Sequence, residues 1–229
     1  MKKLGTLLLA CVLSLSLVGC GNSETNQGES TKANVSGKVV LEGSTSMEKL
    51  MNALKEAIRE DYPELSLEPQ FTGSGSGIKA VASGKVDIGN SSRALTDEEK
   101  AQGIEENVVA LDGIAMITEK SNTVKNLTKQ QLADIYTGKI KNWKEVGGKD
   151  SEIRAFQRPE GSGSQSAMLR FMGNTPLKEP ITEDVPEGMG GIISQTADYQ
   201  NRENAIGYSF RFYASEMASN DKIRLLEID

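Results

Sequence analysis

Four short segments rich in Gly, Ser and Thr carry most of the side chains in this chain that could do chemistry. They lie at residues 43–46, 73–77, 89–93 and 161–164, and three of them run directly into a predicted helix. The first turn of a helix has unpaired backbone N–H groups and a partial positive charge, and nearby hydroxyls or Gly amides add further donors. Such a set can bind a phosphate-like oxyanion without a metal ion or a covalent step.

A single segment of this kind is ordinarily a turn or a helix cap, because Ser, Thr and Gly favour both. The combination is more demanding, since three helix starts and an Arg occur together. Arg158 lies shortly before the last segment, and its planar guanidinium can donate two parallel hydrogen bonds to an oxyanion. We therefore interpret the four segments as parts of one anion-binding site.

The composition excludes several kinds of active site. The chain has no His and only two Cys, Cys11 and Cys20, both near its N-terminus. His-based catalytic triads and the usual zinc sites need residues that are missing, and no free thiol is expected in the mature protein. We expect no metal ion and no cofactor.

Two Ser-x-x-Lys matches leave a serine hydrolase or acyltransferase as a remote alternative. They begin at Ser46 and Ser76, and this motif supplies the nucleophile of penicillin-binding proteins and β-lactamases. Neither is accompanied by Ser-Asp-Asn or Lys-Thr-Gly, and a four-residue match is expected by chance in so Ser-rich a chain. A P-loop is excluded as well, because no Lys follows Gly-Ser-Gly-Ser at 161–164. The segments therefore favour binding over catalysis, and we expect no enzyme.

Residues 1–19 have the features of a secretory signal peptide. Lys2 and Lys3 precede an apolar run at 4–18, which is short for a membrane-spanning helix. Leu-Val-Gly-Cys at 17–20 resembles the bacterial lipobox, in which the Cys becomes the lipidated first residue of the mature protein. Residues 20–36 are nearly all small or polar and predict a flexible tether. We expect a secreted protein that a lipid on Cys20 anchors to the outer face of a Gram-positive cell membrane; an ordinary signal peptide or a membrane anchor is the alternative.

The net charge argues against nucleic acid as a partner. Lys and Arg number 26 and Asp and Glu 32, a net charge of −6, which becomes −8 once Lys2 and Lys3 are removed. An acidic surface repels a polyphosphate backbone. A small anion is not excluded, because helix dipoles and one or two Arg residues decide its binding locally.

Strand and helix patterns alternate along the rest of the chain, which is typical of an α/β fold with mainly parallel sheets. Thr45 with Glu48 and Thr96 with Glu99 match capping boxes, and each pair predicts a helix start. An almost continuous apolar run at 108–118 predicts a strand buried on both faces. The other expected strands lie at 39–42, 65–71, 87–89, 153–156 and 205–210, and the other expected helices at 47–58, around 78–82, and at 129–136, 164–172 and 192–199.

Six blocks of the sequence carry a family resemblance. They are Gly-Ser-Thr-Ser (43–46), Phe-Thr-Gly-Ser-Gly-Ser-Gly-Ile-Lys (71–79), Val-Asp-Ile-Gly-Asn-Ser-Ser-Arg (86–93), Leu-Ala-Asp-Ile-Tyr-Thr-Gly-Lys-Ile-Lys-Asn-Trp (132–143), Gln-Arg-Pro-Glu-Gly-Ser-Gly-Ser (157–164) and Asn-Ala-Ile-Gly-Tyr (204–208). In this order they resemble the PstS-type phosphate-binding proteins of bacterial phosphate ABC transporters. One block alone is weak evidence, but six in the right order are specific, and the resemblance extends from residue 39 to the end of the chain.

This resemblance implies an α/β, two-lobed, periplasmic-binding-protein-like fold of type II, with the ligand in the cleft between lobes that close on it. It also implies that inorganic phosphate is captured and delivered to the permease subunits of an ABC transporter. Matching positions suggest phosphate ligands from both lobes. The first lobe would supply Ser44, Thr45, Ser46, Ser74 and Ser92, with Arg93 as a further candidate. The second lobe would supply Arg158, Ser162, Gly163 and Ser164, with Glu160 as a residue that could hold Arg158 in place.

Ser92 departs from many members of the family, which have an Asp at this position. That carboxylate accepts the proton of hydrogen phosphate, which sulfate lacks, so selectivity against sulfate is less secure here. The Ser92 hydroxyl can also accept that proton, and Arg93 could add positive charge, although it is equally explained as a partner of Asp97 or Glu98. A carrier of sulfate or molybdate with the same architecture is the main alternative function, and an adhesin that uses the anion site structurally is another.

The resemblance assigns residues 37–117 to the first lobe and 118–229 to the second lobe and the start of a return to the first. Family members continue past the position of Asp229 and complete the first lobe with that segment, so we expect the first lobe to lack this completion here. Trp143, the only Trp, is expected to pack inside the second lobe or, alternatively, to face the transporter.

Overall fold

The computed structural model of the chain describes residues 35–177, 182–185, 188–198, 204–217 and 221–229. Cys20, the signal peptide and nearly all of the predicted tether lie outside the described residues. Within the described part, no helix is long and apolar enough to cross a membrane.

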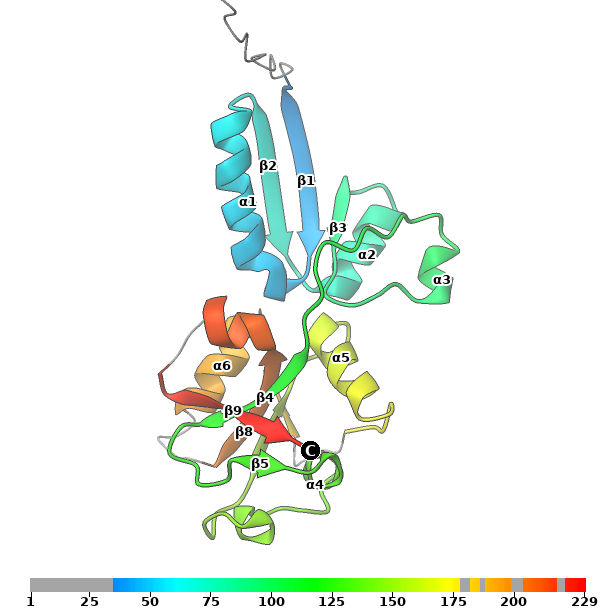
Figure 1. The fold of residues 1–229 in the computed structure, drawn as a ribbon. Helices are drawn as coiled ribbons and strands as arrows, with labels where there is room; N and C mark the ends of the chain where they lie inside the picture. The colour runs from blue at the N-terminus through cyan, green and yellow to red at the C-terminus, as the bar shows by residue number, and fades with distance from the viewer. Residues whose placement is uncertain (1–34, 178–181, 186–187, 199–203, 218–220) are drawn as a thin grey trace, which may run out of the picture. The chain divides into compact units, whose positions relative to one another are not determined.

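The first half of the described chain forms a parallel three-stranded sheet in the order β2-β1-β3 (Figure 1). Its strands are β1 (Gly37–Gly43), β2 (Leu65–Phe71) and β3 (Ile88–Asn90). Helix α1 (Glu48–Asp61) packs on β2, and helix α2 (Ser74–Ala82) packs on β1 and β3. The small core of this sheet consists of Leu41, Met51 and Leu67 with five partly buried neighbours.

The second half forms a six-stranded sheet in the order β5-β9-β4-β8-β6-β7. Strand β4 runs antiparallel to both β8 and β9, whereas the other pairs are parallel. The strands are β4 (Ile114–Glu119), β5 (Asn126–Leu127), β6 (Arg154–Gln157), β7 (Thr182–Asp184), β8 (Ala205–Phe210) and β9 (Ile223–Ile228). The helices of this half are α4 (Lys129–Tyr136), α5 (Gly163–Phe171) and α6 (Gly188–Asp198), and its short helical turns are η2 (Trp143–Val146) and the π-helical η4 (Tyr213–Met217).

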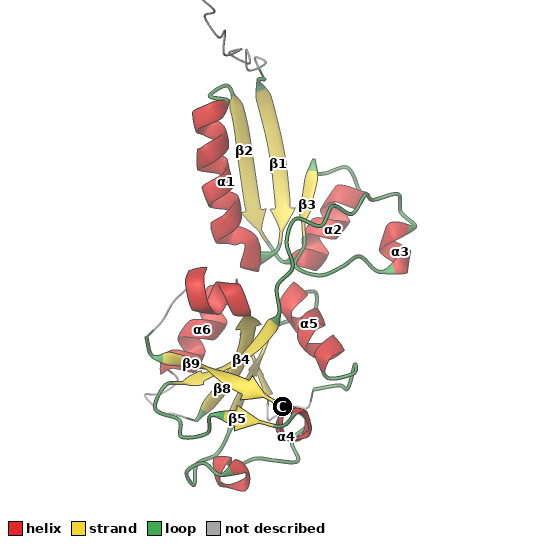
Figure 2. Ribbon diagram, viewed as in Figure 1, coloured by secondary structure: helices red, strands yellow, loops and turns green. Residues whose placement is uncertain are grey.

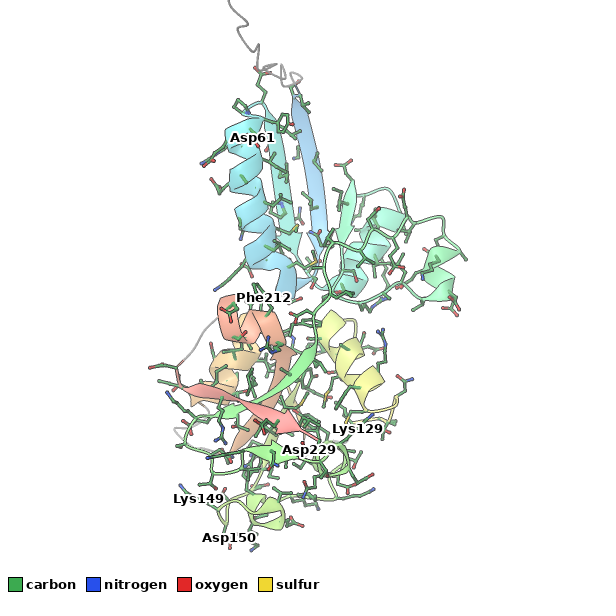
Figure 3. All side chains as sticks on the ribbon, in the orientation of Figure 1. Asp61, Lys129, Lys149, Asp150, Phe212 and Asp229 are labelled. Atoms are coloured by element: carbon green, nitrogen blue, oxygen red, sulfur yellow. The ribbon has the colours of Figure 1, made fainter. Side chains whose placement is uncertain are left out.

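The last described strand, β9, lies inside this sheet between β5 and β4. Lys129 and Asp229 lie close together in Figure 3, and the backbone N–H of Lys129 donates to the Asp229 carbonyl over 3.0 Å. Strand β4 begins at Ile114, so residues 114–117, which the sequence resemblance assigns to the first lobe, belong to the six-stranded sheet.

The large core lies around the six-stranded sheet and confirms the packing prediction for Trp143. This side chain is fully buried, and its Nε1 donates to the Asn204 carbonyl over 3.0 Å. It packs in one cluster with Tyr136 and Tyr208, whose ring centroids are 6.0 Å apart. The closely packed side chains of this half therefore hold the loops at the ends of its strands in place.

The predicted strand at 108–118 is wrong over its first half. The strand begins only at Ile114, and Val108, Val109 and Leu111 are 70, 74 and 93 % exposed. An apolar run is buried as a strand only where other strands pair with it. No described strand pairs with residues 104–113, which lie in extended loop backbone (Figure 2).

The capping box predicted for Thr45 and Glu48 is also wrong, although the helix is present. A 3₁₀ turn, η1 (Thr45–Met47), precedes α1, and neither η1 nor α1 has a side-chain cap. The added turn displaces Thr45 from the cap position of α1, which Met47 occupies. The capping box of Thr96 and Glu99 is confirmed at helix α3 (Asp97–Lys100). The helix expected at 129–136 is α4, which Thr128 caps.

Candidate functional site

Four Ser hydroxyls form a hydrogen-bonded cluster at the carboxyl ends of the strands of the three-stranded sheet. The Ser44 hydroxyl donates to Ser92 Oγ over 2.8 Å and lies 2.8 Å from Ser46 Oγ. Ser92 Oγ lies 3.2 Å from Ser74 Oγ, and the Ser92 backbone N–H donates to Ser74 Oγ over 3.1 Å. Ser44 and Ser74 are only 2 and 0 % exposed. Residues from three separate segments of the sequence therefore converge on one point.

Parallel pairing explains this convergence. Ser44, Ser74 and Ser92 each follow the carboxyl end of a strand, namely β1, β2 and β3, and parallel strands bring these ends to the same edge. Gly43 permits the close approach, because a Cβ there would lie 1.9 Å from the Asn90 carbonyl oxygen. The Ser44 N–H donates to the same carbonyl over 2.9 Å.

The start of helix α5 lies directly against this hydroxyl cluster. A Cβ on Gly163 would lie 2.1 Å from Ser92 Oγ and 2.5 Å from Ser74 Oγ. The Gly75 N–H, in the first turn of α2, donates to the Gly161 carbonyl over 3.0 Å. The structure thus brings the Gly-Ser segment at 161–164 together with those at 43–46, 73–77 and 89–93.

Ser162 and Ser164 shape the first turn of α5. Ser162 is its N-cap and accepts from the Gln165 N–H at 3.5 Å, and its hydroxyl lies 2.9 Å from that of Ser164. The N–H groups of Gly163 and Ser164 have no partner among the described residues. Both residues are buried, so two backbone donors remain for a ligand at a helix N-terminus.

Arg158 follows the end of β6 and is 4 % exposed. Its backbone N–H donates to the Tyr208 hydroxyl over 2.7 Å and to Gln165 Oε1 over 3.1 Å, which fixes the chain at this point. Its guanidinium donates through Nη1 to the Val185 carbonyl. Glu160 is exposed on the turn between Arg158 and Ser162, and its role in holding Arg158 stays a prediction.

Arg93 forms an ion pair with a residue that neither sequence alternative named. Its Nη1 and Nη2 donate to the two oxygens of Glu99 over 2.7 and 2.6 Å, whereas the expected partners were Asp97 or Glu98. Hydrogen bonding to Arg93 lowers the pKa of Glu99 to about 2, and the same contact raises the pKa of Arg93. This carboxylate therefore stabilises the fold at pH values above its ordinary pKa of 4.5, and that contribution is lost as the pH falls toward 2.

Gly188, at the start of α6, is a neighbour of the candidate ligand Thr45 that sequence reasoning missed. Gly188 has a φ of +87°, and a Cβ there would lie 3.4 Å from the Thr45 Cβ. Thr45 is half-buried at the start of η1. The Gly-Met-Gly-Gly sequence at 188–191 was an available signal, but the predicted helix began at 192 and omitted it.

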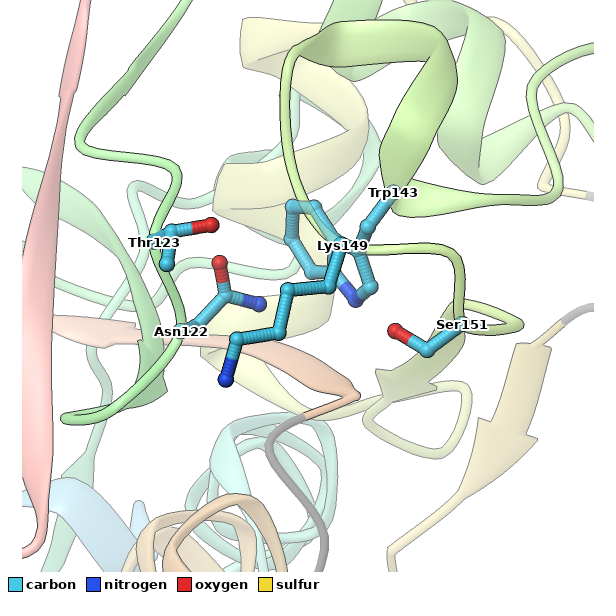
Figure 4. Close-up of a pocket in the computed structure, with 5 residues that line it drawn as sticks. All are labelled: Asn122, Thr123, Trp143, Lys149 and Ser151. Carbon is cyan, nitrogen blue, oxygen red and sulfur yellow. The ribbon is translucent and has the colours of Figure 1, made fainter.

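A second hollow, outside the cluster, does not match the predicted chemistry. It is a shallow recess without enclosed room for a water molecule, and it is lined by Asn122, Thr123, Trp143, Lys149 and Ser151 (Figure 4). None of the candidate residues from the Gly-Ser segments contributes to it. Among the described residues, no three His, Cys, Asp or Glu side chains gather where they could bind a metal ion.

Counting protons shows what the cluster can do chemically. If Ser44 donates to Ser92, then Ser46 donates to Ser44, and the contact between Ser74 and Ser92 uses only one of their two protons. One hydroxyl proton therefore stays available beside the two free N–H groups of α5. The described bonds of these four hydroxyls go to other hydroxyls and to one backbone N–H, and none goes to a carboxylate. The arrangement is a donor-rich site for a small oxyanion.

Comparison with known proteins agrees with this geometry. Residues 28–228 match the family model described as a PBP superfamily domain. The phosphate-binding protein PstS of Bacillus subtilis is 34 % identical to the chain, over 100 % of the chain and 75 % of that protein. A Clostridium perfringens phosphate ABC transporter substrate-binding protein, solved with bound phosphate, is 40 % identical with a TM-score of 0.73, over 84 % of this chain and 76 % of that one.

A phosphate transport receptor from Vibrio cholerae has the same fold with more distant sequence. It is 28 % identical with a TM-score of 0.64, over 84 % of this chain and 76 % of that one. The predicted α/β fold of the type II binding proteins is thereby confirmed. The chain belongs to the PBP superfamily and, within it, to the PstS-type phosphate-binding proteins.

Proposed function

We propose that this protein captures inorganic phosphate outside the cytoplasm and delivers it to the permease of an ABC transporter for import. The observation that carries the proposal is the meeting of the Ser44, Ser74 and Ser92 hydroxyls with the free N–H groups at the start of α5. The proposal is supported by the names of the relatives, which are phosphate-binding proteins and substrate-binding proteins of phosphate transporters.

In this proposal the phosphate has ligands on both sheets. The lobe of the three-stranded sheet contributes Ser44, Thr45, Ser46, Ser74 and Ser92. The lobe of the six-stranded sheet contributes Arg158, Ser162, Gly163 and Ser164. A dehydrated phosphate needs many donors, and a guanidinium with several hydroxyl and backbone N–H groups supplies them without chemistry.

We also propose that the site binds and does not catalyse. The Ser46 hydroxyl, which begins one of the Ser-x-x-Lys matches, lies 2.8 Å from the Ser44 hydroxyl. A nucleophilic Ser needs a base within hydrogen-bond reach, whereas the described partners of this cluster are hydroxyls. Incubation with an acylating β-lactam probe should therefore leave the mass of the protein unchanged.

The first prediction concerns the choice of anion. Phosphate and arsenate should bind, and sulfate should bind at least about tenfold more weakly, because the hydroxyl cluster can accept the proton that sulfate lacks. Calorimetric titration with phosphate, arsenate, sulfate and molybdate measures this order. Sulfate or molybdate binding as tightly as phosphate would favour the alternative of another tetrahedral oxyanion, for which the absence of a carboxylate in the described cluster is the specific argument.

The second prediction concerns the membrane anchor, which we propose to be a lipid on Cys20. Cys20→Ser should release the protein from washed membranes into the medium without changing its phosphate affinity, because the predicted tether separates the lipid from the fold. Fractionation followed by immunoblotting measures the release. Retention of the variant in the membrane fraction would contradict the lipobox interpretation.

A further inference from the structure

The turn that carries Ser92 is also held by hydrogen bonds outside the hydroxyl cluster. The Ser91 hydroxyl donates to the Arg93 carbonyl over 2.7 Å and accepts from the Arg93 N–H at 3.2 Å. The Arg93 guanidinium then donates to both oxygens of Glu99. Ser92 therefore contacts the hydroxyl cluster, while the next residue, Arg93, is fixed by a bidentate ion pair with Glu99.

Glu99 is itself fixed by the capping box of α3. Its backbone N–H donates to Thr96 Oγ1 over 3.2 Å, and its Oε2 accepts from the Thr96 N–H at 2.8 Å. The Arg93 and Glu99 side chains are only 12 and 18 % exposed, so the solvent screens their attraction weakly. The Lys38–Glu68 pair, at 56 and 46 % exposure, is a typical surface pair by comparison.

We propose that Arg93 and Glu99 are positioning residues of the anion site, and that their ion pair holds the turn at 91–93 so that the Ser92 hydroxyl stays between Ser44 and Ser74. This inference rests on the proposed function, because it assigns a further part of the same site. It differs from the sequence expectation, in which Arg93 itself is a phosphate ligand. Both terminal nitrogens of the guanidinium are already bound to Glu99, so Arg93 acts through Ser92.

The contact with α5 explains why the position of this turn matters. Ser92 Oγ lies 2.1 Å from the place of a Cβ on Gly163, so it reaches the helix start that carries the free N–H groups. A turn released from Glu99 would no longer hold the hydroxyl at this point, and the anion would lose one ordered partner. Positioned donors bind more tightly than mobile ones, because their conformational entropy is already restricted.

The test compares Arg93→Ala, Glu99→Ala and Ser92→Ala, singly and combined, by calorimetric titration with inorganic phosphate. We expect Arg93→Ala and Glu99→Ala each to raise the Kd about tenfold, the loss of one hydrogen bond to a charged ligand. In the Ser92→Ala background, Arg93→Ala should change the Kd by less than about twofold, because the Ser92 hydroxyl that Arg93 positions is already absent. If Arg93 were a direct ligand, Glu99→Ala would free it, and affinity would stay equal or rise.

Glu68→Gln is the matched control, because it breaks an ion pair between β1 and β2 without touching the turn. It should bind phosphate as the wild type does, and thermal melts without ligand should show all variants folded. Wild-type affinity in Arg93→Ala, retained affinity in Glu99→Ala, or additive losses in the combined variants would each overturn the inference. Wild-type protein that does not bind phosphate would refute the proposed function instead, so the two failures are distinguishable.

Discussion

Gly163→Ala should weaken phosphate binding by about a hundredfold or more, while the unliganded protein stays folded. The added methyl would lie 2.1 Å from Ser92 Oγ and 2.5 Å from Ser74 Oγ, and 3.2 Å from the Ser92 carbonyl carbon. Either the two hydroxyls rotate away or the start of α5 moves off the cluster. In both cases the anion loses about two hydrogen bonds to a charged group, each of about 1.5–3 kcal/mol. Calorimetry measures the change in Kd.

Gly190→Ala is the matched control for this substitution. It adds the same methyl to a glycine in α6, where the Cβ would meet only the Tyr213 hydroxyl at 3.8 Å, an ordinary contact. Its phosphate affinity should therefore match the wild type. Ala is a good helix former, so neither variant should unfold its helix. Equal affinity of Gly163→Ala and wild type would place the ligand away from the start of α5.

The local elements of the site were predictable from the sequence because their signals are local. Residues 65–71 and 205–210 form strands as predicted. The helices expected around 78–82 and at 164–172 begin at 74 and 163, inside the Gly-Ser segments. The clustering of Ser44, Ser74 and Ser92 follows from parallel pairing, since each follows a strand of the same sheet. The residue types of the site could therefore be predicted from the sequence, whereas their arrangement required the structure.

The remaining features depend on contacts between segments that are distant in the sequence. The sequence around Gly163 does not indicate that Ser92 lies against it. A glycine at this position is equally typical of an ordinary helix start. The partner of Arg93 was missed by one residue, because Asp97, Glu98 and Glu99 are equally acidic and only the capping box selects Glu99. Local sequence gives the type of group but not which of several neighbours the fold presents.

Exposed apolar residues also show that local sequence does not determine which side chains are buried. The run at 108–111 has the composition of a buried strand and yet lies in exposed loop backbone, because pairing decides burial. Leu50 and Leu54 are apolar residues of α1 that are 44 and 41 % exposed, whereas Met51 on the same helix is buried. Phe212, labelled in Figure 3, is 55 % exposed beside the buried strand β8. Periodicity identifies a helix face or strand but not what covers it.

Arg158→Ala should have an effect as large as that of Gly163→Ala, and for a different reason. Arg158 is 4 % exposed and is the Arg of the Gly-Ser segment in the six-stranded half, so its loss would leave a buried anion without its positive partner. Truncating one partner of a buried charge pair costs about 2–5 kcal/mol, which is about thirtyfold to several thousandfold in Kd. Arg158→Lys keeps the charge but loses the planar fork, so its affinity should fall between those of the wild type and Arg158→Ala.

The matched control is Arg170→Ala, which removes an exposed Arg from the last turn of the same helix that starts at the site. A second readout separates binding from folding. Phosphate should raise the melting temperature of wild type and Arg170→Ala by the same amount, and that of Arg158→Ala by much less, because ligand stabilisation scales with the logarithm of ligand concentration over Kd. The unliganded Arg158→Ala protein should still melt cooperatively, which shows that the variant is folded when its affinity is measured. An undiminished phosphate shift in this variant would remove Arg158 from the site and leave the hydroxyl cluster and the start of α5 as the whole of it.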